Sequence, residues 1–244
     1  MEARLAALAP GLLHTPLLWL TLTLLVFQGA EALFRRSGAH PLSNPVLLSV
    51  AAISALLLAC HIEYQVYFSG ARFLHFLLGP ATVALAVPLY RQMEIIRKSF
   101  AAIMVSLLAG SLTGMGSALA LGWLCRADPR IILSMAPKSV TTPIAMGIAG
   151  EIGGLPSLTA VIVIVTGISG AAFGGWALDR ARVKDPVARG LAYGTASHGI
   201  GTARAMHASP VSGAFAGLAM GLNGLATALI LPALVSLLHI GALK

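Results

Sequence analysis

Long apolar segments alternate with short polar ones along the whole chain. Because a helix of about 20 apolar residues spans a bilayer, these segments predict membrane-spanning helices. In chain order they cover residues 12–33, 46–60, 73–90, 100–124, 155–178 and 211–238. The weakly apolar, glycine-interrupted segment 190–210 adds another. We predict an all-α polytopic membrane protein with six to eight membrane segments, two of them interrupted or re-entrant and forming a central polar site.

The stretch from Pro137 to Glu151, PKSVTTPIAMGIAGE, breaks this pattern. Pro143 removes a backbone donor, and Pro137 disfavours helical dihedrals at the residue before it, so the chain is expected to unwind here. Lys138 lies in the same stretch, although a charge at the bilayer centre costs about 2.5–3.5 kcal/mol or more. Unwound backbone at membrane depth is tolerated only inside protein or along a water-filled cavity. The stretch therefore predicts a polar binding site within a membrane protein.

Composition supports one membrane domain over residues 1–244. The chain is 57% hydrophobic and 10% charged, whereas soluble domains are about 25% charged. The net charge of +8 comes from short basic clusters at the ends of apolar segments, which indicates orientation of the spans and not nucleic-acid binding. Cys60 and Cys125 lack metal-ligand spacing and the histidines are scattered, so we predict no metal site and no cofactor.

The basic clusters also orient the segments. Placing residues 35–36, 91–98 and 180–189 on the cytoplasmic side makes the segment 155–178 run inward. The segment 131–150 must then enter and leave on the outer side, which favours a re-entrant loop over a broken crossing helix. Under the same scheme, residues 190–210 form either a second hairpin entering from inside or a short broken crossing. Two interrupted segments that meet from opposite faces are typical of transporter sites.

The second polar stretch is TASHGIGTAR, from Thr195 to Arg204. Its glycines permit tight turns and close backbone approach. Free backbone N–H groups beside Lys138 and Arg204 would form a small anion site, as they do at helix N-termini. In the segment 100–124, Gly110, Gly114 and Gly116 are the expected points of close helix contact.

Together, PKSVTTPIA and GTASHGIGTAR strongly resemble motifs of the LrgB/CidB family. Asn44-Pro45 and LGPATVALAVPLY, residues 78–90, extend the resemblance to about residues 17–238. The family includes YohK-like proteins and the C-terminal half of the plastid glycolate/glycerate transporter. The resemblance implies a multi-pass protein of the inner (plasma) membrane with an LrgA/CidA-type small membrane subunit as its partner. It implies either transport of small carboxylates such as pyruvate, glycolate or glycerate, or an antiholin-like role in murein hydrolase export. Glu151 departs from the motif.

The candidate substrate-binding residues are Lys138, Ser139, Thr141, Thr142, Thr195, Ser197, His198, Thr202, Arg204 and Pro80. The two cations are candidate carboxylate ligands, although Lys138 would also suit a loop tip that reaches water. His198 would either relay a proton or bond to neighbouring hydroxyls. The hydroxyl side chains would line the site or cap broken helices, and Pro80 would add a third break near the site.

These residues favour a carrier of small monocarboxylates, working with protons, with sodium or passively. The alternative is a holin- or antiholin-like regulator of murein hydrolase export and cell lysis, which needs assembly surfaces but no internal charged site. An intramembrane hydrolase is disfavoured, because Ser139 beside Lys138 and Ser197 beside His198 are adjacent pairs, and adjacent residues do not face each other on a helix. We therefore predict that the chain is not an enzyme.

Overall fold

The structure is a computed structural model that describes residues 15–38, 43–84, 87 and 90–238. The described residues form helices and contain no strand, which confirms the predicted all-α class for this part of the chain. The start of the first predicted span and Pro88 of the third lie outside the described residues. The chain divides into two compact units, residues 1–84 and 85–244, and each is described by itself.

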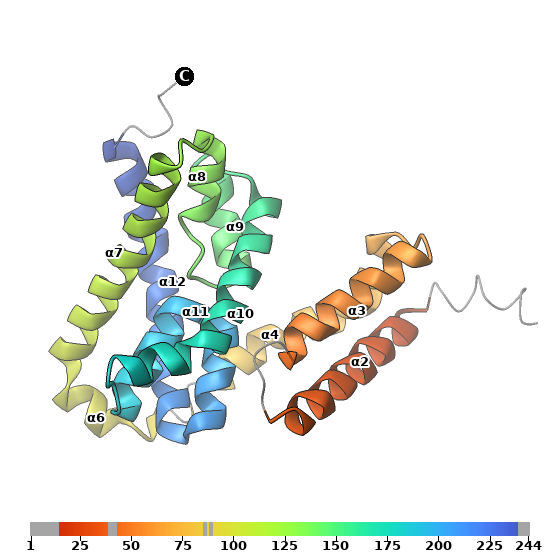
Figure 1. Cartoon of the computed structure of the whole chain (residues 1–244), viewed down its shortest axis with the longest axis horizontal. Coiled ribbons are helices and arrows are strands. Elements are labelled where there is room, and N and C mark those ends of the chain that lie inside the picture. Colours follow the sequence, from red (N-terminus) through yellow and green to blue (C-terminus); the bar gives the residue numbers. More distant parts are fainter. Residues whose placement is uncertain (1–14, 39–42, 85–86, 88–89, 239–244) are drawn as a thin grey trace, which may run out of the picture. The chain divides into compact units, whose positions relative to one another are not determined.

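The first unit contains α2 (Pro16–Arg36), α3 (Pro45–Ala59) and α4 (Tyr64–Ala84), with α2 packed against both of the others (Figure 1). Trp19 of α2 is 2% exposed and meets Tyr67 of α4 edge to face, with ring centroids 6.0 Å apart. α4 begins at Tyr64 and not at the predicted residue 73, because Tyr67 and Gly70 of the polar and aromatic linker pack on α2, although Tyr64 stays 60% exposed.

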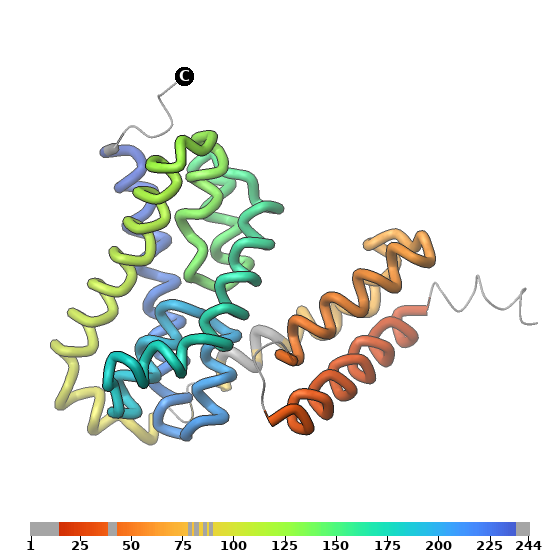
Figure 2. The backbone as a smooth tube through the Cα atoms, in the orientation of Figure 1, coloured from red at the N-terminus to blue at the C-terminus, as the bar shows by residue number. Residues whose placement is uncertain are grey.

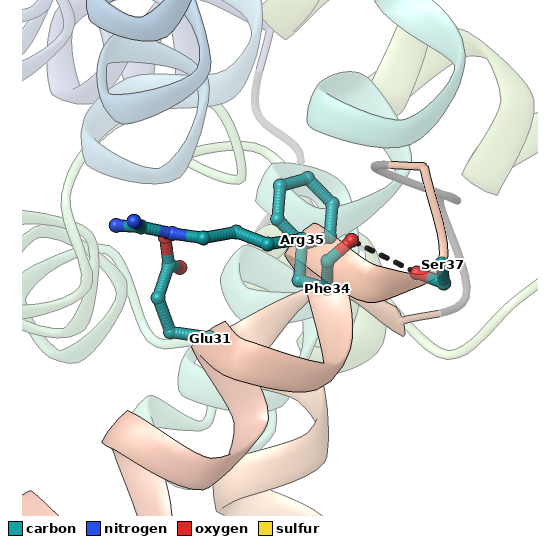
Figure 3. A network of polar contacts seen from close by, with 4 residues as sticks. All are labelled: Glu31, Phe34, Arg35 and Ser37. Atoms are coloured by element: carbon teal, nitrogen blue, oxygen red, sulfur yellow. Dashed lines mark hydrogen bonds and ion pairs between the residues drawn. The ribbon is translucent and has the colours of Figure 1, made fainter.

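Local side-chain bonds set the helix ends in this unit. At the end of α2, Arg35 Nε donates to Glu31 Oε1 at 2.9 Å and Ser37 Oγ donates to the Phe34 carbonyl at 2.9 Å (Figure 3). The Asn44-Pro45 pair starts α3, because Asn44 Oδ1 accepts from the backbone N–H groups of residues 46 and 47. Asparagine before a first-turn proline is a strong helix start.

The second unit holds the polar stretches. Its helices are α6 (Met93–Lys98), α7 (Phe100–Leu124), α8 (Pro129–Met135), α9 (Thr142–Glu151), α10 (Pro156–Arg180), α11 (Pro186–Ala208) and α12 (Pro210–Leu238). Prolines begin α8, α10 and α11, as first-turn prolines do. The basic segment 91–98 contains a short helix, α6, in which Lys98 pairs with Glu94 at 2.6 Å.

The helices α8 and α9 form a helical hairpin, called here the first hairpin. Leu133 of α8 and Ile148 of α9 pack in one cluster with Leu231 and Val235, near the end of α12. Between the two helices, residues 136–141 are not helical, and the chain there reaches Asn223 near the middle of α12. The chain therefore runs down along α12, turns and returns to the same end, which is the upper end in Figure 2.

The helix α11 is a second hairpin, because its backbone breaks at Ser197 (φ −131°, ψ 15°) and His198 (φ 41°, ψ −132°). Gly194 in the first arm lies against Ala216 of α12. Ala205 in the second arm packs in one cluster with the same alanine. Both arms thus lie beside the first half of α12, and the turn points toward the middle of the unit. The two hairpins reach the middle from opposite ends.

Four described helices are long and apolar enough to cross a membrane by length and composition: Pro16–Arg36, Phe100–Leu124, Pro156–Arg180 and Pro210–Leu237. Pro45–Ala59 is a shorter apolar helix. Large apolar side chains are exposed on these helices, for example Val105 at 68% and Leu229 at 68%, as expected of a surface that faces lipid. The helices are those of a membrane protein, while the count of six to eight membrane segments stays a prediction.

Candidate functional site: a central polar cavity between two hairpin tips

The tips of the two hairpins meet at one side chain of α12. Asn223 is 1% exposed. Its Nδ2 donates to the Ser139 carbonyl at 3.2 Å and to the Thr195 carbonyl at 3.1 Å. These carbonyls belong to the two polar stretches found in the sequence. The structure therefore brings the two stretches together.

A cavity of about 860 Å³ lies beside the tips, lined by residues of α7, α10, α11 and the first hairpin. Hydroxyl side chains are its main polar lining: Ser106, Thr113, Ser117, Ser139, Thr166, Ser169, Thr195 and Ser197. Of the described residues that line it, only Lys138 carries a charge. The cavity is thus lined by small and apolar residues together with eight hydroxyl side chains and one cation.

Lys138 has no acidic partner among the ion pairs of the described residues. Its Nζ donates to the Gly114 carbonyl of α7 at 3.4 Å, which is a long contact. A half-buried ammonium held only by one carbonyl leaves donors free for an anion. A carboxylate in the cavity would supply the missing negative charge.

Glycines on α7 and α10 make room for the tips. A Cβ at Gly110 would lie 3.0 Å from Thr195 Cγ2, and one at Gly114 would lie 3.4 Å from Ser139 Oγ. A Cβ at Gly170 would overlap Ser197 Oγ. The expected contacts at Gly110 and Gly114 are confirmed, whereas the expected contact at Gly116 is not found in the described part of the chain, where no atom lies within 4 Å of a Cβ built there.

His198 and Thr202 belong to the turn of the second hairpin and do not line the cavity. His198 is 4% exposed, and its Nε2 lies 2.9 Å from the Val163 carbonyl of α10. Thr202 Oγ1 donates to the His198 carbonyl at 2.8 Å. The histidine is therefore held by a backbone carbonyl and not, as one sequence-based alternative had it, by neighbouring hydroxyls.

Arg204 requires a correction. It lines a different cavity, of about 540 Å³, together with Asp179, Arg180 and Arg189. The expected joint anion site of Lys138 and Arg204 is therefore not formed. The cause is the turn at residues 197–198, which sends the second arm of α11 back from the middle and carries Arg204 away from the tips.

Three other candidates lie outside the lining of the central cavity. Thr141 and Thr142 are half-buried at the start of α9. Pro80 lies inside α4, in the first unit. Their predicted part in substrate binding stays a prediction.

The sequence analysis missed Asn223 and the hydroxyls of α7 and α10. The α7 hydroxyls follow helical periodicity, at positions 106, 113 and 117, which places them on one face. Asn223 is an amide within a long apolar helix, and a polar side chain in such a helix usually faces the protein interior. The spacing of the α7 hydroxyls and the isolated amide in α12 were both visible in the sequence, and both indicate a polar surface that faces inward.

The fold and the cavity together define a class: a helical membrane protein with a cavity beside the tips of two opposed helical hairpins. The model of the LrgB-like family matches residues 23–237, and the chain belongs to that family.

Similar proteins extend over nearly the same length. An uncharacterized protein of Bacillus subtilis, YwbG, is 37% identical over 218 residues, which are 89% of this chain and 96% of that protein. A second, YxaC, is 36% identical over 219 residues, 90% of this chain and 95% of that protein. An uncharacterized protein of Haemophilus influenzae is 34% identical over 196 residues, 80% of this chain and 85% of that protein. No solved structure matches.

Proposed function

We propose that this protein is a membrane carrier of small monocarboxylates of the pyruvate, glycolate and glycerate kind. The observation that supports this most is the central cavity, in which Lys138 is a cation without an acidic partner among hydroxyl side chains. An ammonium binds a carboxylate by a charge-assisted hydrogen bond. The surrounding serines and threonines suit the hydroxyl or carbonyl group that these acids carry beside the carboxylate. A volume of about 860 Å³ admits such an acid together with water.

The same proposal includes a membrane topology. The first hairpin enters from the outer side and the second from the cytoplasmic side of the inner membrane, so that both tips lie near the bilayer midplane. Support comes from the basic cluster between α10 and α11, which favours a cytoplasmic location, and from the opposed hairpins of the second unit. Broken helices that meet at the midplane are a common way of building a transport site.

An LrgA-type small membrane subunit is the proposed partner. This part of the proposal is supported by family membership alone. The competing role, an antiholin-like regulator of murein hydrolase export, has no use for an internal cation in a polar chamber. The cavity therefore supports the carrier over the regulator.

Uptake into proteoliposomes tests the proposal. The purified protein, with and without an LrgA-type small subunit from the same organism, is given radiolabelled pyruvate, glycolate and glycerate, with glycerol as the uncharged match of glycerate. We expect saturable uptake of at least one acid and none of glycerol above empty liposomes. If no acid enters with either preparation, while deleting the protein still changes hydrolase release from cells, the regulator replaces the carrier.

A further inference from the structure

A second cavity gathers arginines where α10 ends and α11 begins. Its volume is about 540 Å³, and its charged lining residues are Arg180, Arg189, Arg204 and Asp179. Three arginines against one aspartate give a formal charge of +2. This excess distinguishes it from the central cavity, which holds one cation among hydroxyls.

The single aspartate is already engaged. Arg189 donates through one Nη to Asp179 Oδ1 at 2.6 Å and to the Val183 carbonyl at 2.9 Å. Arg180 and Arg204 take part in no ion pair among the described residues. Two guanidinium groups at this cavity are thus left without a negative charge.

Tyr193 adds a hydroxyl to the same cavity. The ring lies against Gly174, where a Cβ would come within 2.8 Å of Cε1, and its hydroxyl is 3.2 Å from a Cβ built on Gly175. Gly175 is itself a lining residue. The two glycines therefore let the ring lie on α10 with its hydroxyl at the cavity, where it can donate to an anion.

The cavity lies at the end of an apolar helix. Arg180 is the last residue of α10, a candidate membrane span. Trp176, one turn earlier, lines the cavity and is 71% exposed. Exposed tryptophans and terminal arginines are typical of the headgroup region of a bilayer. An occupant is therefore expected to be an anion present at that depth.

We propose that this cavity binds the phosphate of an anionic phospholipid headgroup, with Arg180 and Arg204 on the phosphate oxygens and Tyr193 donating a further hydrogen bond. The planar guanidinium fork matches phosphate oxygens with two parallel hydrogen bonds. Basic pockets between helices on the cytoplasmic side of a membrane recognise such headgroups. An acyl chain would then lie along the exposed ring of Trp176. The proposal rests on the topology proposed above but not on the carried substrate, although Trp176 lines both cavities.

Thermal unfolding of the purified full-length protein in detergent tests this site. The probes are phosphatidylglycerol, phosphatidylcholine with the same acyl chains, and inorganic phosphate. We expect phosphatidylglycerol to raise the unfolding midpoint in a saturable way and the other two to leave it unchanged. Arg204→Gln and Arg180→Gln should each weaken the apparent affinity for phosphatidylglycerol about tenfold or more, since each removes a charge-assisted bond.

Arg182→Gln is the matched control, because Arg182 is exposed in the loop that follows α10, two residues after Arg180, and does not line the cavity. It removes the same charge and should leave the affinity unchanged. Equal loss in all three variants would overturn the site in favour of nonspecific attraction. Equal shifts with inorganic phosphate and phosphatidylglycerol would overturn the lipid assignment in favour of a soluble anion. If Arg204→Gln fails to fold, the comparison of Arg180→Gln with Arg182→Gln tests the site without it, because Arg180 is exposed.

Discussion

At the scale of single residues, Asn223 is the side chain that joins the two hairpins. Breaking a helix leaves backbone carbonyls without helical partners, and buried carbonyls need a donor. The two Nδ2 hydrogens of Asn223 serve one carbonyl from each tip, those of Ser139 and Thr195. Because the tips also line the cavity, this amide fixes the distance between its two walls.

Replacing Asn223 by leucine, which has a similar size but no donor, should therefore destabilise the protein. Each orphaned carbonyl costs about 1–3 kcal/mol, and the gain from removing the buried Oδ1 of Asn223, which lacks a partner among the described residues, offsets only part of this. The net loss should therefore be about 1 kcal/mol or more and should lower the thermal unfolding midpoint in detergent. The control is Gly221→Ala on the same helix, where nothing lies within 4 Å of the new methyl group. Equal midpoints for Asn223→Leu and the control would show that the amide does not hold the tips.

Single residues of the candidate site differ in how well the sequence predicted their positions. Lys138 and Ser139 were identified because a charge and two prolines are unusual within an apolar chain, and both residues line the cavity. Arg204 was paired with Lys138 because both lie in polar, glycine- or proline-broken stretches. Sequence alone does not tell on which arm of a hairpin a residue falls, and this decides that Arg204 lines another cavity.

At the scale of elements, the two hairpins turn for different reasons. The first turn lies between Pro137 and Pro143, which interrupt the helix by removing donors. The second turn lies at Ser197 and His198, although glycines stand at positions 194, 199 and 201. A positive φ is unusual for histidine, and it is held here by the contact of the ring with the Val163 carbonyl. A tertiary contact of this kind cannot be read from local sequence, so the position of this turn was not predicted.

The fit of the second turn against α10 gives a prediction for that helix. A methyl group at position 170 would overlap Ser197 Oγ and lie 2.7 Å from Ser197 Cβ, so rotating the hydroxyl away would leave the second clash. Gly170→Ala should therefore cost about 1–3 kcal/mol or more through overpacking. Gly116→Ala on α7, where the methyl group meets nothing within 4 Å, should be neutral or stabilising by up to about 1 kcal/mol. Unfolding midpoints of the two variants provide the comparison, and a Gly170→Ala protein as stable as Gly116→Ala would contradict the packing.

At the scale of the whole molecule, the hydrophobic pattern located the long helices α7, α10 and α12 closely, but not α4, which begins nine residues before its predicted start. The predicted span 100–124 coincides with α7, and the predicted 155–178 and 211–238 differ from α10 and α12 by at most two residues at either end. The cavity was beyond this method, because its lining joins side chains from positions 106 to 197 that become neighbours only through packing. Two long-range predictions were nevertheless available: the polar stretches indicated a shared site, and charge bias indicated the re-entrant path of residues 131–150.

Cysteine labelling in intact cells tests that path. Cys60 and Cys125 are free and exposed, so they are first replaced by serine. Single cysteines at Asp128 and Ser157, which are exposed at the two ends of the first hairpin, should both react with a membrane-impermeant maleimide from outside. A cysteine at Lys184, in the loop between α10 and α11, should react only after the membrane is permeabilised. Labelling of Asp128→Cys and Ser157→Cys from opposite sides would replace the hairpin with a broken crossing helix.

The central claim is that the cavity at the hairpin tips binds the transported carboxylate through Lys138. Uptake by Lys138→Ala and Lys98→Ala proteoliposomes, at matched protein levels, tests it most directly. Lys98 is exposed in α6 and pairs with Glu94, so its loss should change uptake little. Losing a buried charge partner costs about 3–5 kcal/mol, so Lys138→Ala should weaken affinity by several hundred-fold or more, and Lys138→Arg should recover only part. Equal uptake by Lys138→Ala and Lys98→Ala would contradict the account.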